Sequence, residues 1–339
     1  MTDAPTDLLD ALRRLRLLAA GEAPRLTPLP GGVASDIWRV DLAGGPVCVK
    51  RALPKLKVAA EWRAPIERNA YEVAWIDTAN AIVPGVAPRI LGHDAAAGLF
   101  VMEFLDPARH PLWKAELMAQ RADPIFAMNV GHRLAAIHSA TAGKADVAAR
   151  FATDAIFHAI RLEPYLEATG RDHPDLAPAL AALVATTAET RRALVHGDVS
   201  PKNILVGPQG PVFLDAECAW YGDPAFDLAF CLNHLLLKCL PHPQTAPNYV
   251  NCFNTLANAY LGGVTWEAVG EIERRTARLL PGLLLARIDG KSPVEYVTEE
   301  RRKTMVRRVA RHLLLAPPKQ LDEVVERWEA ALTEAGLAA

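Results

Sequence analysis

The chain has 339 residues, of which 51% are hydrophobic and 22% charged, and its formal net charge is −2. This composition is typical of a folded globular protein large enough to form two cores. The near-neutral charge gives no electrostatic reason to expect a nucleic acid or an anionic membrane as partner. No apolar run reaches membrane-spanning length, and residues 1–7 lack the pattern of a secretory signal, so we expect a cytoplasmic protein.

The N-terminal part begins with a predicted helix at residues 8–15 and continues with predicted strands. Residues 30–40 place glycines and small residues between extended stretches, which is typical of a hairpin whose backbone can approach phosphate groups closely. Ser35 is then the candidate phosphate contact, and an ordinary β-turn is the alternative. Residues 46–50 alternate between apolar and other positions like a strand, and this strand ends at Lys50.

The next predicted elements are a helix and two strands. Residues 66–76 carry apolar side chains at helical spacing, together with two glutamates, Glu67 and Glu72. Residues 89–94 and 99–105 are apolar segments that predict two strands joined by a loop.

The most informative segment is HGDVSPKN at residues 196–203, followed by the apolar run that ends at Asp215. Residues 204–214 contain two short apolar stretches around a Gly-Pro-Gln-Gly turn, which predicts a hairpin that folds Asp215 back toward Asn203. Phosphoryl transfer needs a carboxylate to accept a hydroxyl proton and hard oxygen ligands for Mg²⁺. Asp198 is the candidate base, and Asn203 and Asp215 are the candidate metal ligands.

Three segments resemble the aminoglycoside phosphotransferase and choline kinase family: HGDVSPKN at 196–203, DAE at 215–217 and GDPAFDLA at 222–229. The resemblance implies a protein-kinase-like fold that acts on small molecules with ATP and Mg²⁺. It also implies that Asp198 is the catalytic base, that Asn203 and Asp215 bind Mg²⁺, and that Asp227 supports the catalytic loop. Glu217 either assists a second metal or orients the substrate, or it is an ordinary polar residue beside the metal site.

The same resemblance assigns roles to the N-terminal segments. Lys50 matches the lysine strand of kinases, whose ammonium group holds the α- and β-phosphates of ATP. Glu72 lies where the family places the glutamate that pairs with this lysine, and Glu67 is the competing choice. Residues near Glu103 correspond to the kinase hinge, where backbone groups bind adenine and apolar side chains flank it; the candidates there are Met102, Glu103 and Phe104.

We therefore expect an α+β fold with two lobes. Residues 1–104 form a small, β-rich N-terminal ATP-binding lobe, and residues 105–339 form a larger, mainly helical lobe that supplies the base and binds the acceptor. ATP is expected in the cleft between the lobes.

The acceptor should be a small molecule that carries a hydroxyl group. Eleven residues separate Asp215 from Asp227, which leaves no room for the activation segment on which protein kinases bind peptides. Residues 287–312 contain eight Lys and Arg against four Asp and Glu, a charge that disfavours polycationic aminoglycosides. A neutral or anionic polyol is favoured. The candidate contacts are Arg287, Asp289 and Lys291, with Arg301 and Arg302 as further candidates; the alternative is that these late arginines form the solvated face of a helix.

Within the family, residues 161–166, the late arginines and the chain length resemble methylthioribose kinases, although Asn203 departs from the residue expected in their loop. A sugar kinase of this kind with shifted specificity is our first hypothesis. The alternatives are an amino-alcohol kinase of the choline or homoserine type, an aminoglycoside phosphotransferase, a nucleotide-binding pseudokinase, and a phosphate-ester hydrolase that uses Asp198 and His196.

Overall fold

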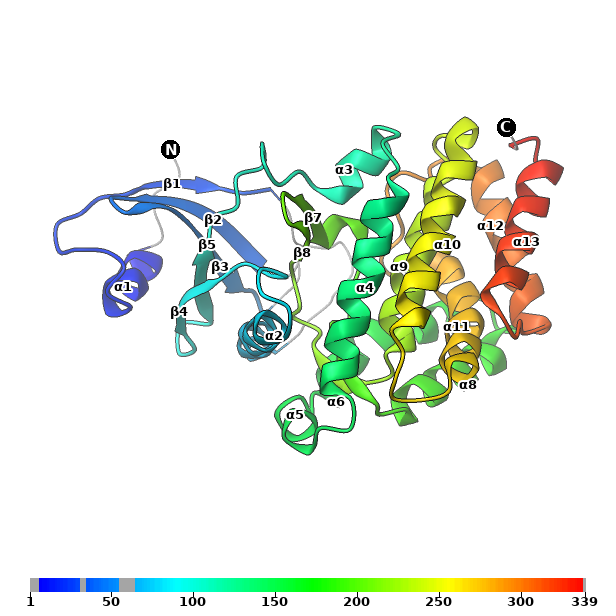
Figure 1. Cartoon of the computed structure of the whole chain (residues 1–339), viewed down its shortest axis with the longest axis horizontal. Helices are drawn as coiled ribbons and strands as arrows, with labels where there is room; N and C mark the ends of the chain where they lie inside the picture. The colour runs from blue at the N-terminus through cyan, green and yellow to red at the C-terminus, as the bar shows by residue number, and fades with distance from the viewer. Residues whose placement is uncertain (1–5, 31–34, 55–64, 338–339) are drawn as a thin grey trace.

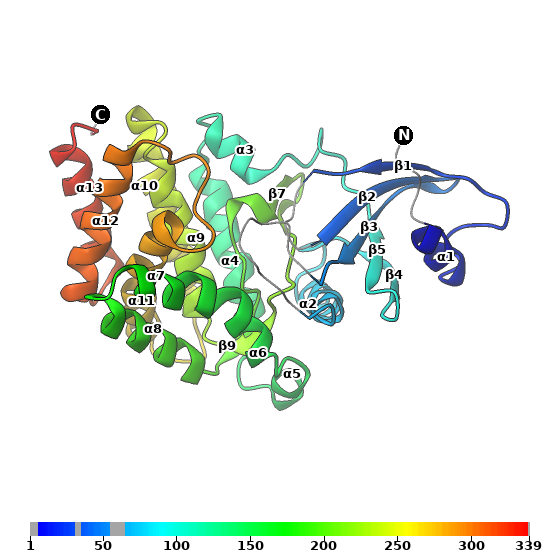
Figure 2. The same cartoon turned by 180° about the vertical axis from the view of Figure 1, so that it is seen from behind.

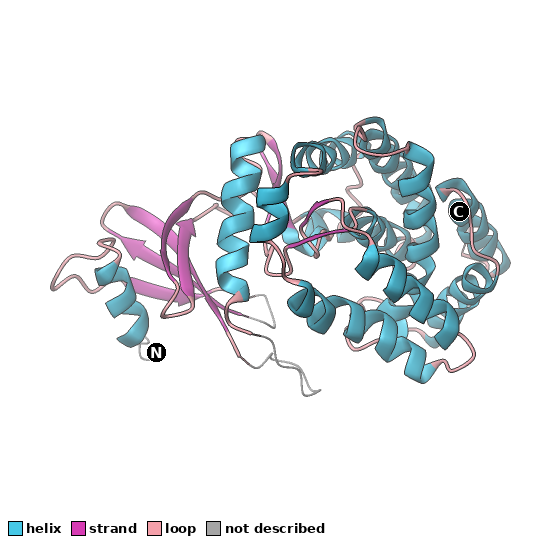
Figure 3. Cartoon of the chain, turned by 90° about the horizontal axis from the view of Figure 1, so that it is seen from below, coloured by secondary structure: helices cyan, strands magenta, loops and turns pink. Residues whose placement is uncertain are grey.

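The computed structural model describes residues 6–30, 35–54 and 65–337 of the chain. Most of the strands lie at one end of the molecule and most of the helices at the other (Figure 3). Residues 31–34 of the predicted phosphate-binding hairpin lie outside the described residues. None of the helices in the described residues is long and apolar enough to cross a lipid bilayer.

The N-terminal end is built on an antiparallel sheet of five strands in the order β1-β2-β3-β5-β4. The strands are β1 (Arg25–Pro28), β2 (Ser35–Leu42), β3 (Gly45–Ala52), β4 (Ile90–Asp94) and β5 (Leu99–Glu103). Helix α1 (Thr6–Arg14) lies on one side of this sheet and α2 (Arg68–Ile82) lies between the sheet and the helical region (Figure 1).

Alternation along β3 and β5 directs neighbouring side chains to opposite faces of the sheet. Val49 and Val101 pack with Leu8 and Leu12 of α1 in one apolar cluster. Phe100 belongs to the main core on the other side. Because Lys50 follows Val49, its side chain points toward α2, away from α1. This alternation places a lysine between the sheet and the rest of the molecule.

The C-terminal region is mainly helical, with its strands confined to two short pairs (Figure 2). The pairs are β6 (Ala193–Val195) with β9 (Trp220–Gly222), and β7 (Ile204–Gly207) with β8 (Gly210–Phe213). The α-helices are α3 (Trp113–Met118), α4 (Pro124–Thr141), α5 (Ala145–Arg150), α6 (Asp154–Phe157), α7 (Ala168–Asp172), α8 (Ala177–Glu189), α9 (Ala225–Lys238), α10 (Ala246–Gly262), α11 (Val269–Asp289), α12 (Glu300–Leu315) and α13 (Leu321–Glu334). This region also contains the π-helix η1 (His158–Glu167) and two short 3₁₀ helices, η2 (Pro201–Asn203) and η3 (Pro243–Thr245).

Helix α9 is the centre of the helical region, because every one of its residues is buried. A helix that is apolar all round is stable only when other elements surround it, and here α10 and α11 pack along it. Two polar residues at its start and end, Asp227 and Lys238, are therefore held inside the protein.

The predicted α+β class is confirmed, with a β-rich N-terminal part and a mainly helical remainder. The predicted hairpin after Asn203 is also confirmed, since β7 and β8 pair antiparallel with Ile204 opposite Phe213. Strand β5 ends at Glu103 and α3 begins at Trp113. We propose that the boundary between the two lobes lies in this connection, near residue 104.

Candidate active site

The loop that carries Asp198 is hydrogen-bonded to α9. Asp227, in the first turn of α9, accepts hydrogen bonds from the backbone N–H of His196 at 2.7 Å and of Gly197 at 2.8 Å. Gly197 has φ +81°, and a Cβ there would lie 2.7 Å from Cβ of Cys218. The loop therefore requires glycine at this position. The supporting role expected for Asp227 is confirmed.

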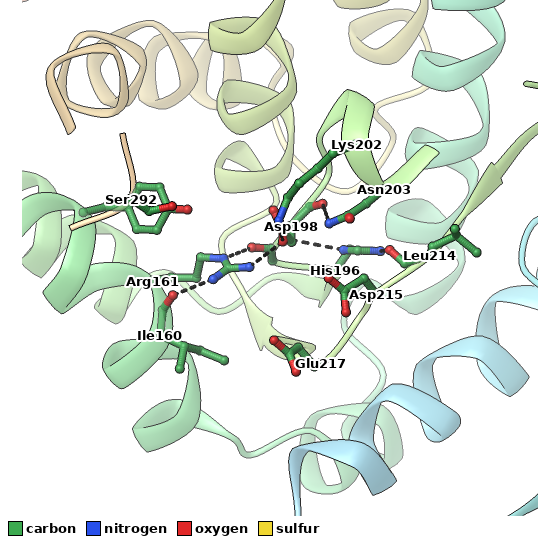
Figure 4. A network of polar contacts seen from close by, with 12 residues as sticks. Ile160, Arg161, His196, Asp198, Lys202, Asn203, Leu214, Asp215, Glu217 and Ser292 are labelled. Atoms are coloured by element: carbon green, nitrogen blue, oxygen red, sulfur yellow. Dashed lines mark hydrogen bonds and ion pairs between the residues drawn. The ribbon is translucent and has the colours of Figure 1, made fainter. Parts of the chain in front are cut away.

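Asp198 is buried, and its two carboxylate oxygens have different surroundings (Figure 4). Oδ2 forms ion pairs with Arg161 at 2.8 Å and with Lys202 at 3.1 Å. Oδ1 has no hydrogen-bond partner among the described residues. Burial acts to raise the pKa of Asp198, but the charges of Arg161 and then Lys202 outweigh burial and lower that pKa well below its usual range. Asp198 is therefore a carboxylate at neutral pH, with one oxygen free to accept a proton.

Arg161 comes from the π-helix η1 and was not among the predicted site residues. Its guanidinium also donates to the carbonyl oxygens of Gly197 and, at 2.5 Å, Ile160. Pro164 lies inside η1 and lacks the N–H that an α-helical turn uses there, which accounts for a widened helix. The proline three residues after Arg161 was the available signal in the sequence, but a proline alone does not show which side chain it redirects.

Asn203 directly precedes β7 and Asp215 lies just after β8, so the hairpin brings the two residues together (Figure 4). Nδ2 of Asn203 donates to the carbonyl oxygen of Asp198 at 3.1 Å, and the backbone N–H of Leu214 donates to the carbonyl oxygen of Asn203 at 2.8 Å. Asp215 has φ +68°, a strained conformation for a residue with a side chain. Such strain is common at functional sites.

Lys50 pairs with two carboxylates from different parts of the fold. Its Nζ lies 2.7 Å from Oε1 of Glu72 on α2 and also forms an ion pair with Asp215. Glu67, the competing choice, is exposed. Burial acts to lower the pKa of Lys50, but Asp215 and then Glu72 raise it above its ordinary value, so the lysine stays charged. The structure thus joins the sheet, α2 and the segment after β8 through one ammonium group.

The donor set suits a magnesium ion carried by a nucleotide. Asp215 supplies a carboxylate, and the amide oxygen of Asn203 is available because its nitrogen is already used as a donor. Mg²⁺ is usually held by one or two protein oxygens together with phosphate oxygens and water. In the described part of the chain no group of three or more His, Cys, Asp or Glu could hold a metal ion by itself. The residues therefore fit a metal that arrives with phosphate, and do not fit a closed protein cage.

The predicted nucleotide contacts lie on the sheet. Ser35 is buried at the start of β2, next to the undescribed residues. Met102 pairs with Cys48 of β3, and Glu103 accepts a hydrogen bond from the N–H of Arg89 at 2.8 Å. The ring of Phe104 lies 4.8 Å from the guanidinium of Arg39.

A cavity of about 260 Å³ lies between the segment after β5 and the β7–β8 hairpin. Its lining includes Glu103, Leu105, Gly207 and Val212, and it includes neither Lys50 nor Asp198. This cavity is therefore beside the predicted hinge, and neither Lys50 nor Asp198 faces it.

The predicted acceptor contacts take part in interactions within the protein. Glu217 pairs with Arg68 at 2.8 Å, and Lys291 pairs with Glu163 at 2.8 Å. Asp289 pairs with Arg307 at 2.7 Å and with His173 at 2.9 Å. Of the further candidates, Arg301 donates to the carbonyl oxygen of Ala335 and Arg302 pairs with Glu299 at 3.0 Å.

Arg287 is buried, as Glu217 is, but it forms no ion pair with a carboxylate of the described residues. Its Nη1 donates to the hydroxyl of Tyr165 at 3.3 Å and to Oγ of Ser292 at 2.9 Å. Figure 4 shows Ser292 on the Arg161 side of Asp198. Among the predicted acceptor contacts, Glu217 and Arg287 are therefore the two that are buried.

The family model described as "Phosphotransferase enzyme family" matches residues 25–238. A methylthioribose kinase of Erwinia tasmaniensis is 29% identical over 275 residues, which cover 72% of this chain and 64% of that protein. The chain therefore spans less than two thirds of the length of this curated relative.

Two solved structures show a similar fold. One is a choline/ethanolamine kinase family protein from Mesorhizobium loti, with TM-score 0.52 and 18% identity, covering 95% of this chain and 99% of that chain. The other is amicoumacin kinase hAmiN in complex with AMP-PNP, Ca²⁺ and Ami, with TM-score 0.52 and 14% identity, covering 91% and 93%. At these identities the likeness shows the fold alone, and the predicted protein-kinase-like architecture is confirmed.

Proposed function

The chain belongs to the phosphotransferase enzyme family, and we propose that it transfers the γ-phosphoryl group of MgATP to a hydroxyl group of a small polyol or sugar. The family resemblance expected from the sequence is confirmed by the match over residues 25–238. The complex of amicoumacin kinase with AMP-PNP and Ca²⁺ supports a nucleotide and a divalent cation in this fold. We propose Mg²⁺ as the cation here.

One observation carries the proposal: Asp198 has one oxygen held by two cations and the other without a partner among the described residues, beside Asn203 and Asp215. A base for phosphoryl transfer must be ionised and must have a free lone pair aimed at the acceptor. The ion pairs on Oδ2 fix the plane of the carboxylate, so that Oδ1 is the oxygen left for a substrate hydroxyl. A purely structural aspartate would satisfy both oxygens.

The mechanism follows from these positions. The acceptor hydroxyl donates its hydrogen bond to Oδ1 of Asp198 and attacks the γ-phosphorus in line, so that the new O–P bond forms as the bond to the β-phosphate oxygen breaks. The hydroxyl proton ends on Asp198. Lys50, held by Glu72, positions the phosphates, and Asn203 and Asp215 would hold the metal. When bound, the cation neutralises the charge on the phosphate oxygens.

The acceptor is proposed from charge and from likeness together. The methylthioribose kinase that this chain resembles is named for a sugar substrate. Arg161 and Lys202 place two positive charges at Asp198, and Arg287 is buried beside Tyr165, which Arg161 also contacts. Cationic acceptors such as choline or aminoglycosides would be repelled there. A sugar or polyol is therefore the first candidate, with the amino-alcohol kinases as the runner-up.

The proposal is tested by coupled ADP-release assays of the full chain with sugars, thiosugars, amino alcohols and aminoglycosides, each with and without Mg²⁺. We expect Mg²⁺-dependent ADP release that is stimulated by at least one sugar or polyol. The Asp198→Asn variant should lower kcat by about 10²- to 10⁴-fold, because general-base catalysis is lost. Its affinity for nucleotide should be unchanged.

The matched control is Asp175→Asn, since Asp175 forms an exposed ion pair with Arg311 on the surface. That variant should keep the wild-type rate. Turnover by Asp198→Asn at the wild-type rate would remove Asp198 from the role of base. Hydrolysis of phosphate esters without any need for ATP would replace the kinase with the hydrolase hypothesis.

A further inference from the structure

A second group of buried basic residues lies in the helical region, on α9 and α11. His234 and Lys238 are one helical turn apart on α9, and Arg287 is near the end of α11. Their exposed fractions are 5%, 1% and 7%. We call these three residues the basic cluster.

The basic cluster contains two cations without a carboxylate. Within the described residues no Asp or Glu forms an ion pair with Lys238 or Arg287. Nζ of Lys238 lies 3.3 Å from the ring centroid of Tyr296 and 3.2 Å from Sδ of Met118. A ring face and a thioether are weak partners for a buried ammonium group. Burying a charge without a counterion is costly, so these two residues lower the stability of the folded protein.

Two polar atoms of the basic cluster lack any partner among the described residues. They are Nε2 of His234 and Nε of Arg287, both buried. Nδ1 of His234 has only a long contact of 3.5 Å with the hydroxyl of Tyr296. Buried polar groups in folded proteins nearly always have partners, and an exception calls for a missing ligand or water. The unpartnered atoms lie on the same residues that carry or adjoin the excess positive charge.

The basic cluster adjoins the catalytic base. Tyr165 is the link, because both Arg161 and Arg287 lie 5.7 Å from its ring centroid and Arg161 is paired with Asp198. The charge of Lys202, which is paired with the same aspartate, also contributes to lowering the pKa of His234. Along α9, His234 follows Asp227 by seven residues, or about 10 Å of helix. Tyr165 and α9 therefore connect the basic cluster to the loop that carries Asp198.

The geometry points to an anionic acceptor: we propose that the substrate is a small hydroxy compound whose carboxylate or phosphate group binds Lys238, Arg287 and His234 while its hydroxyl lies at Oδ1 of Asp198. This inference rests on the proposed kinase function and names its acceptor class. An anion would compensate both buried cations and accept from the donors that now have no partner among the described residues. A neutral sugar would leave the charges uncompensated.

The electrostatics of the surrounding groups agree with an anion. Burial, followed by the charge of Lys114, lowers the pKa of Lys238 to about 7, and Arg287 adds to this effect. Glu295 opposes it but is paired with Lys114 at 2.5 Å and is largely exposed. Burial, followed by Arg287 and Lys238, lowers the pKa of His234. A bound anion would favour the charged form of Lys238.

The test measures anion binding by thermal unfolding, independently of turnover. The full chain is titrated at constant ionic strength and pH 6.5 with D-gluconate and its neutral counterpart D-glucitol, with D-ribose 5-phosphate and D-ribose, and with sulfate against chloride. We expect at least one anion to stabilise the wild type more than its counterpart. The Lys238→Met variant should bind that anion about tenfold more weakly or worse, since a hydrogen bond to a charge is lost.

The variants separate a binding role from a structural one. Lys238→Met should raise the melting temperature in the absence of anion, because an uncompensated charge is replaced by an apolar side chain of similar length. Lys319→Met, at an exposed lysine outside the cluster, should behave like the wild type. Should Lys238→Met fail to fold, Lys114→Met provides the second test. This substitution removes the ion pair between Lys114 and Glu295. The unpaired carboxylate near Lys238 should weaken anion binding, by a smaller factor than Lys238→Met does.

The outcomes of the inference and of the proposed function are distinct. The anionic site would be overturned if each anion stabilised the protein no more than its counterpart. It would also be overturned if the wild type, Lys238→Met and Lys114→Met bound the anion with equal affinity. ADP release with neutral sugars that exceeds release with sugar acids and sugar phosphates would overturn it as well, and would leave the kinase function standing. If anion binding depended on Lys238 but the protein released no ADP with any acceptor, the anion site would stand and the proposed kinase function would be refuted.

Discussion

Asp198 shows how single residues set the chemistry of this site. A buried carboxylate would ordinarily take up a proton, because burial disfavours its charge. Arg161 and Lys202 reverse this effect and keep Asp198 ionised. Both bind the same oxygen, so they also fix which oxygen faces the acceptor. In the proposed reaction Arg161 is thus a positioning residue, which would act on the substrate through Asp198.

Replacing Arg161 with methionine should lower kcat and change the pH profile. Without the guanidinium, burial has more weight and the pKa of Asp198 rises, so activity should fall as the pH is lowered through the acidic range, where the wild type stays active. A misplaced carboxylate should lower kcat by about 10- to 100-fold. The measurement is kcat/KM for ADP release between pH 5 and 8, with nucleotide binding followed separately.

Arg311→Met is the control for this variant. Arg311 forms an exposed ion pair with Asp175, which contributes little to stability. Its pH profile should match that of the wild type. An Arg161→Met enzyme whose activity decreases equally at every pH would show that Arg161 supports the fold without acting on the ionisation of Asp198.

At the scale of the elements, the catalytic loop depends on one turn and one helix. The turn at Gly197 needs a positive φ and close approach to Cys218, and α9 supplies the carboxylate that accepts two N–H groups of the loop. Since α9 is buried along its whole length, the loop is anchored to the centre of the helical region. The same helix carries His234 and Lys238, so one element positions both the base and the basic cluster.

Replacing Gly197 with alanine should destabilise the protein by about 1–3 kcal/mol, because the Cβ would meet both the side chain and the backbone of Cys218 in a strained conformation. The displaced loop should also lower kcat. Chemical denaturation measures the first effect and ADP release the second.

Gly262→Ala is the matched substitution. Gly262 ends α10, and a methyl group added there would meet open space on a backbone without a positive φ. Its effect on the free energy of unfolding should stay within about 0.5 kcal/mol. Equal effects of the two substitutions would show that the Gly197 turn tolerates a side chain and does not constrain Asp198.

At the scale of the whole molecule, the ion pair between Lys50 and Asp215 joins the sheet to the helical region. Glu72 adds α2 to this connection. Asp215, Glu72 and Glu217 all act to raise the pKa of Lys50, and its ammonium group pairs directly with the first two of them. A nucleotide-bound divalent cation at Asp215, with the phosphates held by Lys50, would add a further link between the two regions.

We therefore expect MgATP to raise the melting temperature of the full chain. At a ligand concentration about 100 times Kd, the gain in free energy of unfolding is about 2.7 kcal/mol. In Asp215→Ala the Mg²⁺-dependent part of this gain should be lost, because a metal ligand is removed. Thermal unfolding with ATP, with and without Mg²⁺, makes the comparison.

Asp175→Ala, which removes an exposed carboxylate, should retain the full effect of MgATP. If Asp215→Ala also retained it, the metal would be bound elsewhere and the assignment of Asp215 would be wrong. If ATP stabilised the wild type equally without Mg²⁺, the divalent cation would not contribute to nucleotide binding.

The sequence by itself determined those features that local patterns encode. Apolar periodicity and turn residues predicted the β7–β8 hairpin, and this hairpin is what returns Asp215 toward Asn203. The resemblance of the HGDVSPKN and GDPAFDLA segments to the family implied that Asp227 supports the loop, and the hydrogen bonds of Asp227 agree with this. These residues lie within about thirty positions of one another, so short-range geometry decides how they meet.

Only the tertiary structure decided the contacts between distant segments. The pairing of Lys50 with Glu72 in place of Glu67 depends on how α2 is rotated against the sheet. Arg161 reaches Asp198 because a π-helix redirects it, and Lys238 and Arg287 meet because α9 and α11 pack together. Asp289 and Lys291 were predicted from composition, yet they form ion pairs within the protein. The physical reason is that a side chain's partners depend on the packing of whole elements, which a local pattern of residues does not specify.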